Sequence, residues 1–447
     1  MQKYLLIALI VFSLGFMACD DTSEKTNNTN NINNTNSSNN TNNDAGTDAD
    51  SGDGGDASVT ECDAPPRDFW NYDLTVMPPR NVQIPSTCRG MGPNVYVYVA
   101  DEAWDEALVD EQTIENIVNS WETRTAGNSE QGIYSIVTSA FGNPPDVDDN
   151  PRVIILISKL GSYNGHTFDG YFRMENQSPG STSNLTEMLY IDCEHHSPDS
   201  DYLLGVMAHE FQHLISFGLD PMEEDWLDET MSQGAMYLTG YHSDLGYGNS
   251  WLSMRFSSSP LIVSDARNFD YGAGFIFAAY FHHRLGTTGF SDLAAASEHG
   301  IDGLDSVISA SLGISFWDFM LEFGIAALVN DPLIEGGKYS FSTIGEDLSF
   351  PDYTDATSGQ TLNLNTLPGV MHILKYEVNG TPEFTVNADS STLKLAAVHM
   401  GNQTGATVEI IDISSQNASY TAPQTAGNVY FIILQTGSSE TVSLTVE

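Results

Sequence analysis

The chain has 447 residues, 60 of them acidic and 15 basic, which gives a formal net charge of −45. Such an excess of acid excludes the usual basis of nucleic-acid binding, because phosphate groups are recognised by lysine and arginine side chains. A domain takes on the order of 100–200 residues, so this length allows more than one domain.

Residues 1–18 are typical of a signal peptide. A basic residue, Lys3, precedes an apolar run over residues 5–16 that is too short to span a bilayer. The run ends in Phe-Met-Ala-Cys at 16–19, which resembles the lipobox of bacterial lipoproteins with Phe in place of the usual Leu. This resemblance implies lipidation of Cys19, with the lipid anchor as the only membrane contact. The alternative is an ordinary cleaved signal, and both predict an exported protein, either a cell-envelope lipoprotein or a secreted one.

Residues 19–61 are predicted to form a disordered tether. They are rich in Asn, Thr, Ser, Asp and Gly, and few of their side chains could form a core. Such a composition cannot offset the entropy of folding, so we expect a flexible spacer before the folded region.

The sequence indicates one disulfide after the tether. Export permits disulfides, and three cysteines remain, at 62, 88 and 193. We predict a Cys62–Cys88 bridge, since both residues flank the start of the folded region, and this leaves Cys193 over. A catalytic thiol is not indicated, because a cysteine nucleophile needs partners in space that the sequence does not reveal.

Residues 62–350 alternate between predicted strands and helices. β-Branched and aromatic residues predict strands at 95–99, 153–157 and 189–191. Apolar residues at helical spacing predict helices at about 103–121, 130–141, 201–217, 226–239, 272–285 and 303–329. An early sheet followed by mainly helices predicts an α+β fold.

Residues 355–447 are predicted to form an all-β sandwich domain. Short alternating runs occur at 384–386, 393–395, 407–410 and 429–433, separated by Gly, Asn, Ser and Asp. This spacing of short strands and turns is typical of a small β-sandwich. The sequence does not indicate whether such a domain would bind substrate, bind a surface or shield the first domain.

The predicted helix at 201–217 carries the sequence His209-Glu210-Phe211-Gln212-His213. At 100° per residue, the apolar residues fall within about 80° of Phe211, and both histidines fall on the opposite face. Two imidazoles one turn apart can bind the same Zn²⁺, and the glutamate between them can take a proton from water without being a ligand. We therefore predict His209 and His213 as metal ligands and Glu210 as general base. The alternative is a helix with two hydrogen-bonded surface histidines.

A catalytic zinc site needs a third protein ligand and one open position. The metzincin pattern requires Gly at position 216 and His at 219, but the chain has Ser216 and Leu219. The better candidate is Glu229, because the main apolar residues of its helix lie about 160–180° away from it. The alternative is that Glu229, like Asp225 and Asp228, is an acidic residue favoured near a helix N-terminus.

Residues 207–213 and 226–229 together resemble the paired motifs of gluzincin metallopeptidases, and most of all the hyicolysin-type neutral metallopeptidases. The resemblance spans residues 90–340, with Asp228 where Asn is usual and Thr230 where Gly is common. It implies a zincin-like catalytic domain over 62–350, with a small N-terminal sheet and then a mainly helical part. It also implies one catalytic Zn²⁺ and the hydrolysis of peptide bonds.

The segment Asp270-Tyr271-Gly272-Ala273-Gly274 opens the predicted helix at 272–285. Many gluzincins have Tyr-x-x-Gly at this place, and in the aminopeptidase branch that tyrosine stabilises the oxyanion. The resemblance therefore implies a catalytic role for Tyr271. The alternative is an aromatic residue that closes the core beside glycines that permit helix packing.

Two further segments are candidates for binding. Residues 189–192 are predicted either as the edge strand along which an extended substrate lies or as a core strand. Asp146, Asp148, Asp149 and Asn150 could hold Ca²⁺ through oxygen atoms, although they lack the spacing of an EF-hand. A solvated acidic loop is the alternative there.

These patterns predict an exported zinc metalloendopeptidase whose partner is a protein or peptide substrate. An aminopeptidase on the same scaffold is the first alternative, but no GAMEN-like segment precedes the zinc helix. The second is a surface binding or adhesion protein with a vestigial zinc site. The intact Glu210 disfavours it, because a structural site needs no general base. The sequence does not indicate the oligomeric state or the cleavage preference.

Overall fold

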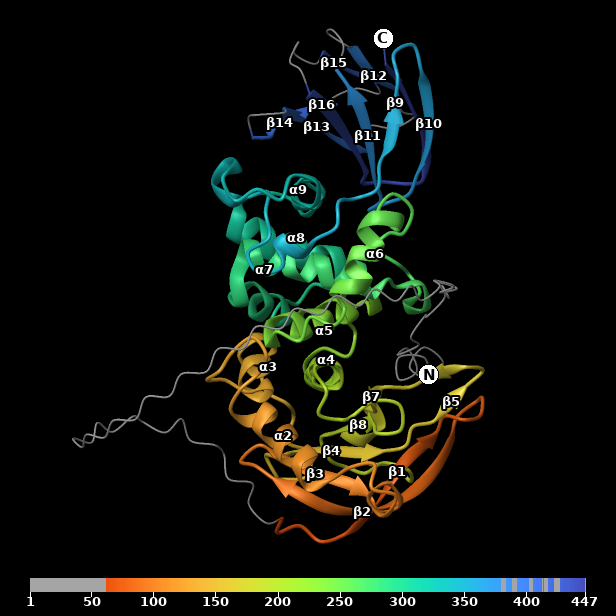
Figure 1. The fold of residues 1–447 in the computed structure, drawn as a ribbon, viewed down its shortest axis with the longest axis vertical. Coiled ribbons are helices and arrows are strands. Elements are labelled where there is room, and N and C mark those ends of the chain that lie inside the picture. The colour runs from red at the N-terminus through yellow and green to blue at the C-terminus, as the bar shows by residue number, and fades with distance from the viewer. Residues whose placement is uncertain are drawn as a thin grey trace, which may run out of the picture.

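The structure is a computed structural model that describes residues 62–378, 383–387, 392–401, 405–411, 413, 417–421 and 427–446. The expected signal peptide, lipidated Cys19 and tether fall at residues 1–61, outside this described part. The described residues form a mixed α/β chain with several sheets, compatible with the predicted α+β class. A mixed sheet, a layer of helices and a second β region follow one another along the long axis of the molecule (Figure 1).

The first sheet has the strand order β1-β2-β3-β4-β8-β7. β3, β4 and β8 run parallel, and β7 runs antiparallel to β8 at the edge. The bounds are Arg67–Asp73 (β1), Arg80–Met91 (β2), Val95–Ala100 (β3), Val153–Ser158 (β4), Gly170–Phe172 (β7) and Met188–Asp192 (β8). The parallel strands are buried on both faces. Alternate side chains enter two different hydrophobic cores, one shared with the helices and the other shared with Phe69 of β1.

The edge of this sheet differs from the sequence prediction. Residues 189–192 belong to β8, which pairs with β4 on one side and with β7 on the other. The edge-strand interpretation of this segment is therefore wrong, and the core-strand alternative is correct. β7 is too short to display an alternating pattern, and β2 contains Pro85 and Gly90, which are uncommon inside strands. The sequence accordingly predicted neither of them.

The helices cover one face of the sheet and extend away from it (Figure 1). α4 contacts β7 and β8, while α5 packs on α4 and α7 packs on α5. Ser200 caps α4 by accepting a hydrogen bond from the backbone N–H of Leu203, and the apolar face around Phe211 is fully buried. The helix bounds are Asp101–Asp105 (α1), Glu111–Glu122 (α2), Ile133–Phe141 (α3), Asp201–Leu219 (α4), Asp225–Thr239 (α5), Leu245–Arg255 (α6), Tyr271–Ala294 (α7), Gly300–Leu312 (α8) and Phe316–Val329 (α9).

Two predicted helices are each divided in the structure. The one at 103–121 becomes α1 and α2, because Ala107 between them has a positive φ of 56°. The one at 303–329 becomes α8 and α9, separated by Gly313 at φ 71° and by a capping box that Ser315 begins. Among the described residues, no single helix is long and apolar enough to cross a membrane; α8 and α9 together would be, but they are bent by 78°.

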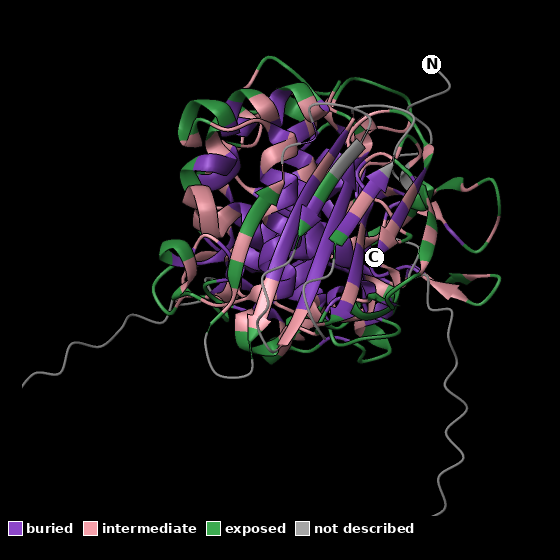
Figure 2. Ribbon diagram, turned by 90° about the horizontal axis from the view of Figure 1, so that it is seen from above, coloured by how far each residue is buried: buried purple, intermediate pink, exposed green. Residues whose placement is uncertain are grey.

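Two sheets pack face to face in the C-terminal part, with the orders β10-β17-β12-β15 and β14-β13-β16-β11-β9. The four strand runs predicted here fall within β12, β13, β14 and β16, so these strands are confirmed. The outer face of the five-stranded sheet packs on α9. The hydrophobic core of the helices therefore continues into the outer face of this sheet. Figure 2 shows the buried middle of these strands and their more exposed margins. The bounds are Thr354–Ala356 (β9), Thr361–Thr366 (β10), Met371–Glu377 (β11), Glu383–Asn387 (β12), Leu393–Gly401 (β13), Thr407–Ile411 (β14), Asn417–Thr421 (β15), Gly427–Gln435 (β16) and Glu440–Val446 (β17).

Candidate metal centre

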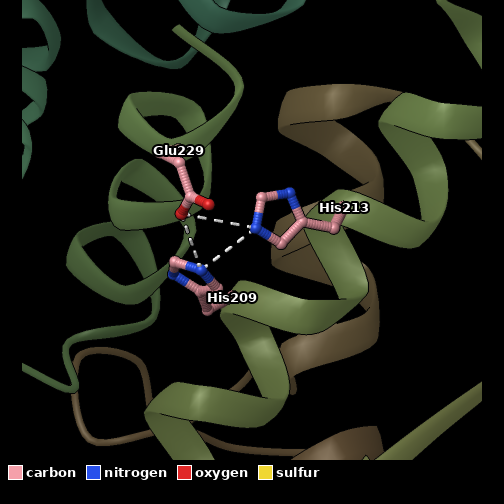
Figure 3. A group of neighbouring side chains, drawn as sticks. All are labelled: His209, His213 and Glu229. Atoms are coloured by element: carbon pink, nitrogen blue, oxygen red, sulfur yellow. Dashed lines mark hydrogen bonds and ion pairs between the residues drawn. The ribbon is translucent and has the colours of Figure 1, made fainter. Parts of the chain in front are cut away.

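Three predicted metal ligands converge from two adjacent helices. His209 and His213 lie one turn apart on α4, and Glu229 lies on α5. Figure 3 shows the three side chains pointing toward one another. The Nε2 atoms of the two histidines are 3.1 Å apart. Glu229 Oε2 lies 3.4 Å from His209 Nε2 and 3.5 Å from His213 Nε2. The structure therefore brings these three residues together, and we call them the ligand triad.

The spacing within the ligand triad fits a tetrahedral metal ion. Ligand atoms that are each about 2.0–2.1 Å from one ion lie about 3.3–3.4 Å from one another at tetrahedral angles, close to the separations found here. Glu229 Oε2 is buried and has no hydrogen-bond partner among the described residues. Two imidazole nitrogens and one carboxylate oxygen are a donor set suited to zinc, and they leave a fourth position open.

The charges around the ligand triad favour a cation. Burial raises the pKa of Glu229, but the positive charges of His213 and His209, both in close contact with the carboxylate, outweigh burial and bring it to about 2. Burial lowers the pKa of His213, but Asp228 and Glu229 together raise it well above its usual value. Both shifts arise from attraction between positive imidazole charge and neighbouring carboxylates. A divalent cation would supply that charge directly.

Asp228 orients His213, a role that the sequence did not predict. Its Oδ2 accepts a hydrogen bond from His213 Nδ1 at 2.9 Å, and its Oδ1 accepts one from Ser216 Oγ at 2.7 Å. A proton held on Nδ1 leaves the lone pair of Nε2 facing the other ligand atoms. The available signal was an acidic side chain directly before Glu229, but an acid near a helix N-terminus is also favoured by the helix dipole.

Asp228→Asn is expected to weaken zinc binding by about 10- to 100-fold, because the amide no longer stabilises the ligating imidazole with a charge. The measurement is the zinc dissociation constant from competition with a chromogenic chelator. Asp225→Asn, on the same turn of α5, is the matched control and should keep the affinity of the unmodified protein. Equal affinities for the two variants would contradict the role of Asp228.

Glu210 lies beside the ligand triad, next to the sheet edge. Its Oε2 accepts a hydrogen bond from the backbone N–H of Phe172 in β7 at 2.9 Å, whereas its Oε1 is buried without a partner among the described residues. The residue is only 2% exposed. Burial raises the pKa of Glu210, although His209 and His213 oppose the rise. A raised pKa and an unengaged oxygen suit a carboxylate that accepts a proton and passes it on.

Tyr271 is the first residue of α7, which Asp270 caps by accepting hydrogen bonds from two backbone N–H groups. Its ring centroid is 6.1 Å from that of His209. Burial and the negative charges of Glu229 and Glu210 raise the pKa of Tyr271 well above its usual value, so the phenol keeps its proton and can donate it in a hydrogen bond. The alternative, in which this segment packs helices together, is supported as well. A Cβ atom added at the next residue, Gly272, would lie 2.4 Å from backbone atoms of α6, so only glycine allows the two helices to approach this closely.

Two cavities meet at Glu210. The smaller one includes His213 and lies along β7. The larger one includes His209 and Tyr271 and extends toward α6. The ligand triad therefore has space on both of its sides.

The structure joins Cys62 to Cys88 in a disulfide, with the two Cα atoms 6.0 Å apart. Cys193 is free and buried. Burial raises the pKa of its thiol to about 12, so the sulfur stays protonated and is a poor nucleophile at neutral pH.

The four residues predicted to bind Ca²⁺ do not act as one group. Carboxylate oxygens of Asp146 and Asp148 approach each other, and the third member of their cluster is Glu187. Asp149 does not belong to that cluster, and Asn150 Oδ1 accepts a hydrogen bond from the backbone N–H of Arg152. Glu187 was not predicted, because it lies about 40 positions further along the chain and only the fold brings it near.

The chain matches no protein-family model and no curated protein sequence. Among solved structures, it is similar to the pre-peptidase C-terminal domain of a collagenase from Bacillus anthracis, at 10% identity and a TM-score of 0.20, over 22% of this chain and 95% of that one. It is also similar to PliG, a periplasmic inhibitor of g-type lysozyme, from Aeromonas hydrophila, at 12% identity and a TM-score of 0.17, over 21% of this chain and 96% of that one. At such TM-scores these likenesses carry no argument about function.

Proposed function

We propose that this chain is a zinc-dependent endopeptidase of the gluzincin type, with a zincin-like catalytic domain. The observation that carries the proposal is the ligand triad with Glu210 beside it. The three ligand atoms lie 3.1–3.5 Å apart, and the unengaged oxygen of Glu210 is buried next to them. A purely structural zinc site closes its fourth position with a protein ligand and has no use for a buried carboxylate at its side.

Each residue has a distinct role in the proposed hydrolysis. His209, His213 and Glu229 would hold Zn²⁺, which supplies Lewis-acid activation of water and of the scissile carbonyl when it is bound. Glu210 accepts a proton from the attacking water as the oxygen adds to the carbonyl carbon. It then passes that proton to the amine nitrogen as the C–N bond breaks. The hydrogen bond from Phe172 fixes one oxygen of Glu210 and leaves the other for this transfer.

The substrate is proposed to bind as an extended strand beside β7. This strand pairs only with β8 among the described strands, so its outer edge has no partner strand there, and Gly170 and Phe172 line the adjacent cavity. An added strand would make main-chain hydrogen bonds there without regard to side-chain identity. Because cavities continue on both sides of Glu210, a chain could extend in both directions from the reacting bond. This favours cleavage inside a chain over removal of one terminal residue.

One observation favours the aminopeptidase alternative. The larger cavity is lined by Asp244 and Gln233, both buried, and Gln233 Oε1 has no partner in the described part of the chain. Burial raises the pKa of Asp244, and Arg255, which lines the same cavity, pairs with Asp270 instead. Such a wall could accept the free amine of a substrate.

Peptides with blocked and free ends separate these alternatives. The zinc-loaded full chain is expected to cleave internal bonds of peptides that are acetylated at the N-terminus and amidated at the C-terminus. Release of single N-terminal residues, lost on acetylation and weakened in Asp244→Asn, would establish the aminopeptidase. Zinc at full occupancy with no cleavage of a varied peptide library would favour the binding protein with a vestigial site.

Tyr271→Phe is expected to lower kcat on the order of 10²-fold with little change in KM, if the phenol stabilises charge that develops only in the transition state. Steady-state kinetics on one blocked peptide measure both constants. Tyr247→Phe, which removes another hydroxyl from the same cavity, is the control. An unchanged kcat for Tyr271→Phe would leave that residue with the packing role alone.

The setting of the enzyme is part of the proposal. Cys19 would carry a lipid, residues 19–61 would form the spacer, and the peptidase would act on proteins or peptides outside the cytoplasm. The excess of acidic side chains suits a well-solvated exported protein. Mass spectrometry of the mature N-terminus would reveal whether Cys19 is lipidated or the signal is simply cleaved.

A further inference from the structure

A cluster of three carboxylates, none of them in the ligand triad, lies in segments that precede two strands of the first sheet. Asp146 and Asp148 belong to the loop between α3 and β4, and Glu187 directly precedes β8. Each contributes one carboxylate oxygen, and these oxygens lie within 4.8 Å of one another. Asp146 and Asp148 are exposed, so solvent reaches the cluster from the loop side.

Glu187 is the unusual member, because it is only 2% exposed. Its Oε1 accepts a hydrogen bond from the backbone N–H of Val147, in the loop between the two aspartates. Its Oε2 is buried and has no hydrogen-bond partner among the described residues. Burial, together with the charges of Asp148 and Asp146, raises the pKa of Glu187 to about 6. A buried carboxylate beside two others is costly unless a cation joins them.

No side chain in the described part of the protein supplies that cation. The nearest basic residue along the loop, Arg152, donates from Nε to the carbonyl oxygen of Gly92 and stacks on the ring of Tyr96. The guanidinium group of Arg152 therefore interacts with Gly92 and Tyr96 and not with the cluster. None of the described salt bridges involves a member of the cluster.

We propose that Asp146, Asp148 and Glu187 together bind one Ca²⁺ ion, with water completing its coordination. All three donors are hard carboxylate oxygens, which suit Ca²⁺. The cluster has no nitrogen or sulfur ligand of the kind that zinc prefers. Ca²⁺ accepts irregular arrangements of six to eight oxygens, whereas Mg²⁺ demands a near-ideal octahedron. The ligand set differs from the one expected from the sequence. Asn150 Oδ1 accepts a hydrogen bond from the backbone N–H of Arg152 and serves the loop itself.

The bound ion would tie the loop before β4 to the start of β8. These strands are neighbours in the sheet, and the backbone N–H of Ile154 already donates to the carbonyl oxygen of Glu187 at 2.8 Å. The same sheet carries β7 at its edge. The site is therefore a stabilising one, outside the proposed catalytic machinery, and it does not depend on the peptidase being active.

Thermal unfolding of the zinc-loaded full chain tests the proposal. About 1 mM CaCl₂ is expected to raise Tm by about 2–4 °C, as a ligand of modest affinity that binds only the folded state does. MgCl₂ at the same concentration should raise it much less, which separates a specific site from screening of the net charge. Calorimetric titration with CaCl₂ should give one site per chain. No chelator is needed, so zinc stays in place throughout.

Two variants decide which residues bind the ion. Glu187→Gln is expected to abolish the Ca²⁺-dependent rise in Tm, whereas Asp149→Asn in the same loop should keep it in full. Asp148→Asn, which lies at the surface, provides the same test if the change at Glu187 prevents folding. An equal rise in Glu187→Gln and the unmodified chain, or no rise in the unmodified chain, would overturn the proposal.

Discussion

Replacing Glu210 with Gln is expected to lower kcat by about 10²- to 10⁴-fold while zinc content stays the same. The amide oxygen of Gln can still accept the hydrogen bond from Phe172 that holds the side chain in place. What the variant loses is the ability to take a proton from water and return it to the leaving amine. The ligand triad does not include Glu210, so metal binding should be unaffected. Hydrolysis of a blocked peptide and elemental analysis of the same sample measure the two quantities together.

The control for this experiment is Glu130→Gln, a change of the same type at an exposed residue. It should leave both activity and zinc content unaltered. A Glu210→Gln enzyme that kept more than about a tenth of the original kcat would exclude Glu210 as the general base. If zinc were lost along with activity, Glu210 would instead hold the site together, and the proposed division between ligands and base would be wrong.

The part of the site that the sequence predicted rests on local periodicity. His209, Glu210 and His213 lie on one helix, so their spacing alone determines which of them share a face. Glu229 could be predicted because its own helix has a clear apolar face opposite to it. That these two faces meet is a tertiary fact, and only the packing of α5 on α4 brings Glu229 Oε2 within 3.5 Å of both histidines.

The residues that were missed act through contacts between distant segments. Phe172 reaches Glu210 through a backbone N–H, a group that every residue except proline has and that leaves no mark in the sequence. Asp228 was visible but ambiguous, because an acid near a helix start is favoured for reasons unrelated to a neighbouring histidine. Glu187 had no local signal, since its partners Asp146 and Asp148 approach it only when β4 and β8 pair. Local patterns thus predicted ligands on helices better than they predicted the strands and loops that complete each site.

Glu229→Ala is expected to weaken zinc binding by more than the 10- to 100-fold typical of losing a hydrogen-bonded outer partner, because a ligand is removed outright. Two imidazoles would remain, and they lie on one helix with no third protein donor in the triad. Zinc should then no longer raise Tm, since the stabilisation by a ligand falls as its dissociation constant rises. The measurements are zinc content after dialysis and Tm with and without added ZnCl₂.

Asp225→Ala is the matched control, because it removes a carboxylate from the first turn of the same helix. If Glu229 were only an acid favoured by the helix dipole, both variants would lower stability by a similar amount, on the order of 0.3–1 kcal/mol, and both would keep zinc. If Glu229 is a ligand, only its variant loses the metal. The ligand interpretation also predicts that Glu229→Ala loses peptidase activity in proportion to zinc occupancy, so that excess ZnCl₂ restores part of it. Full zinc occupancy in Glu229→Ala after dialysis would show that another residue completes the site.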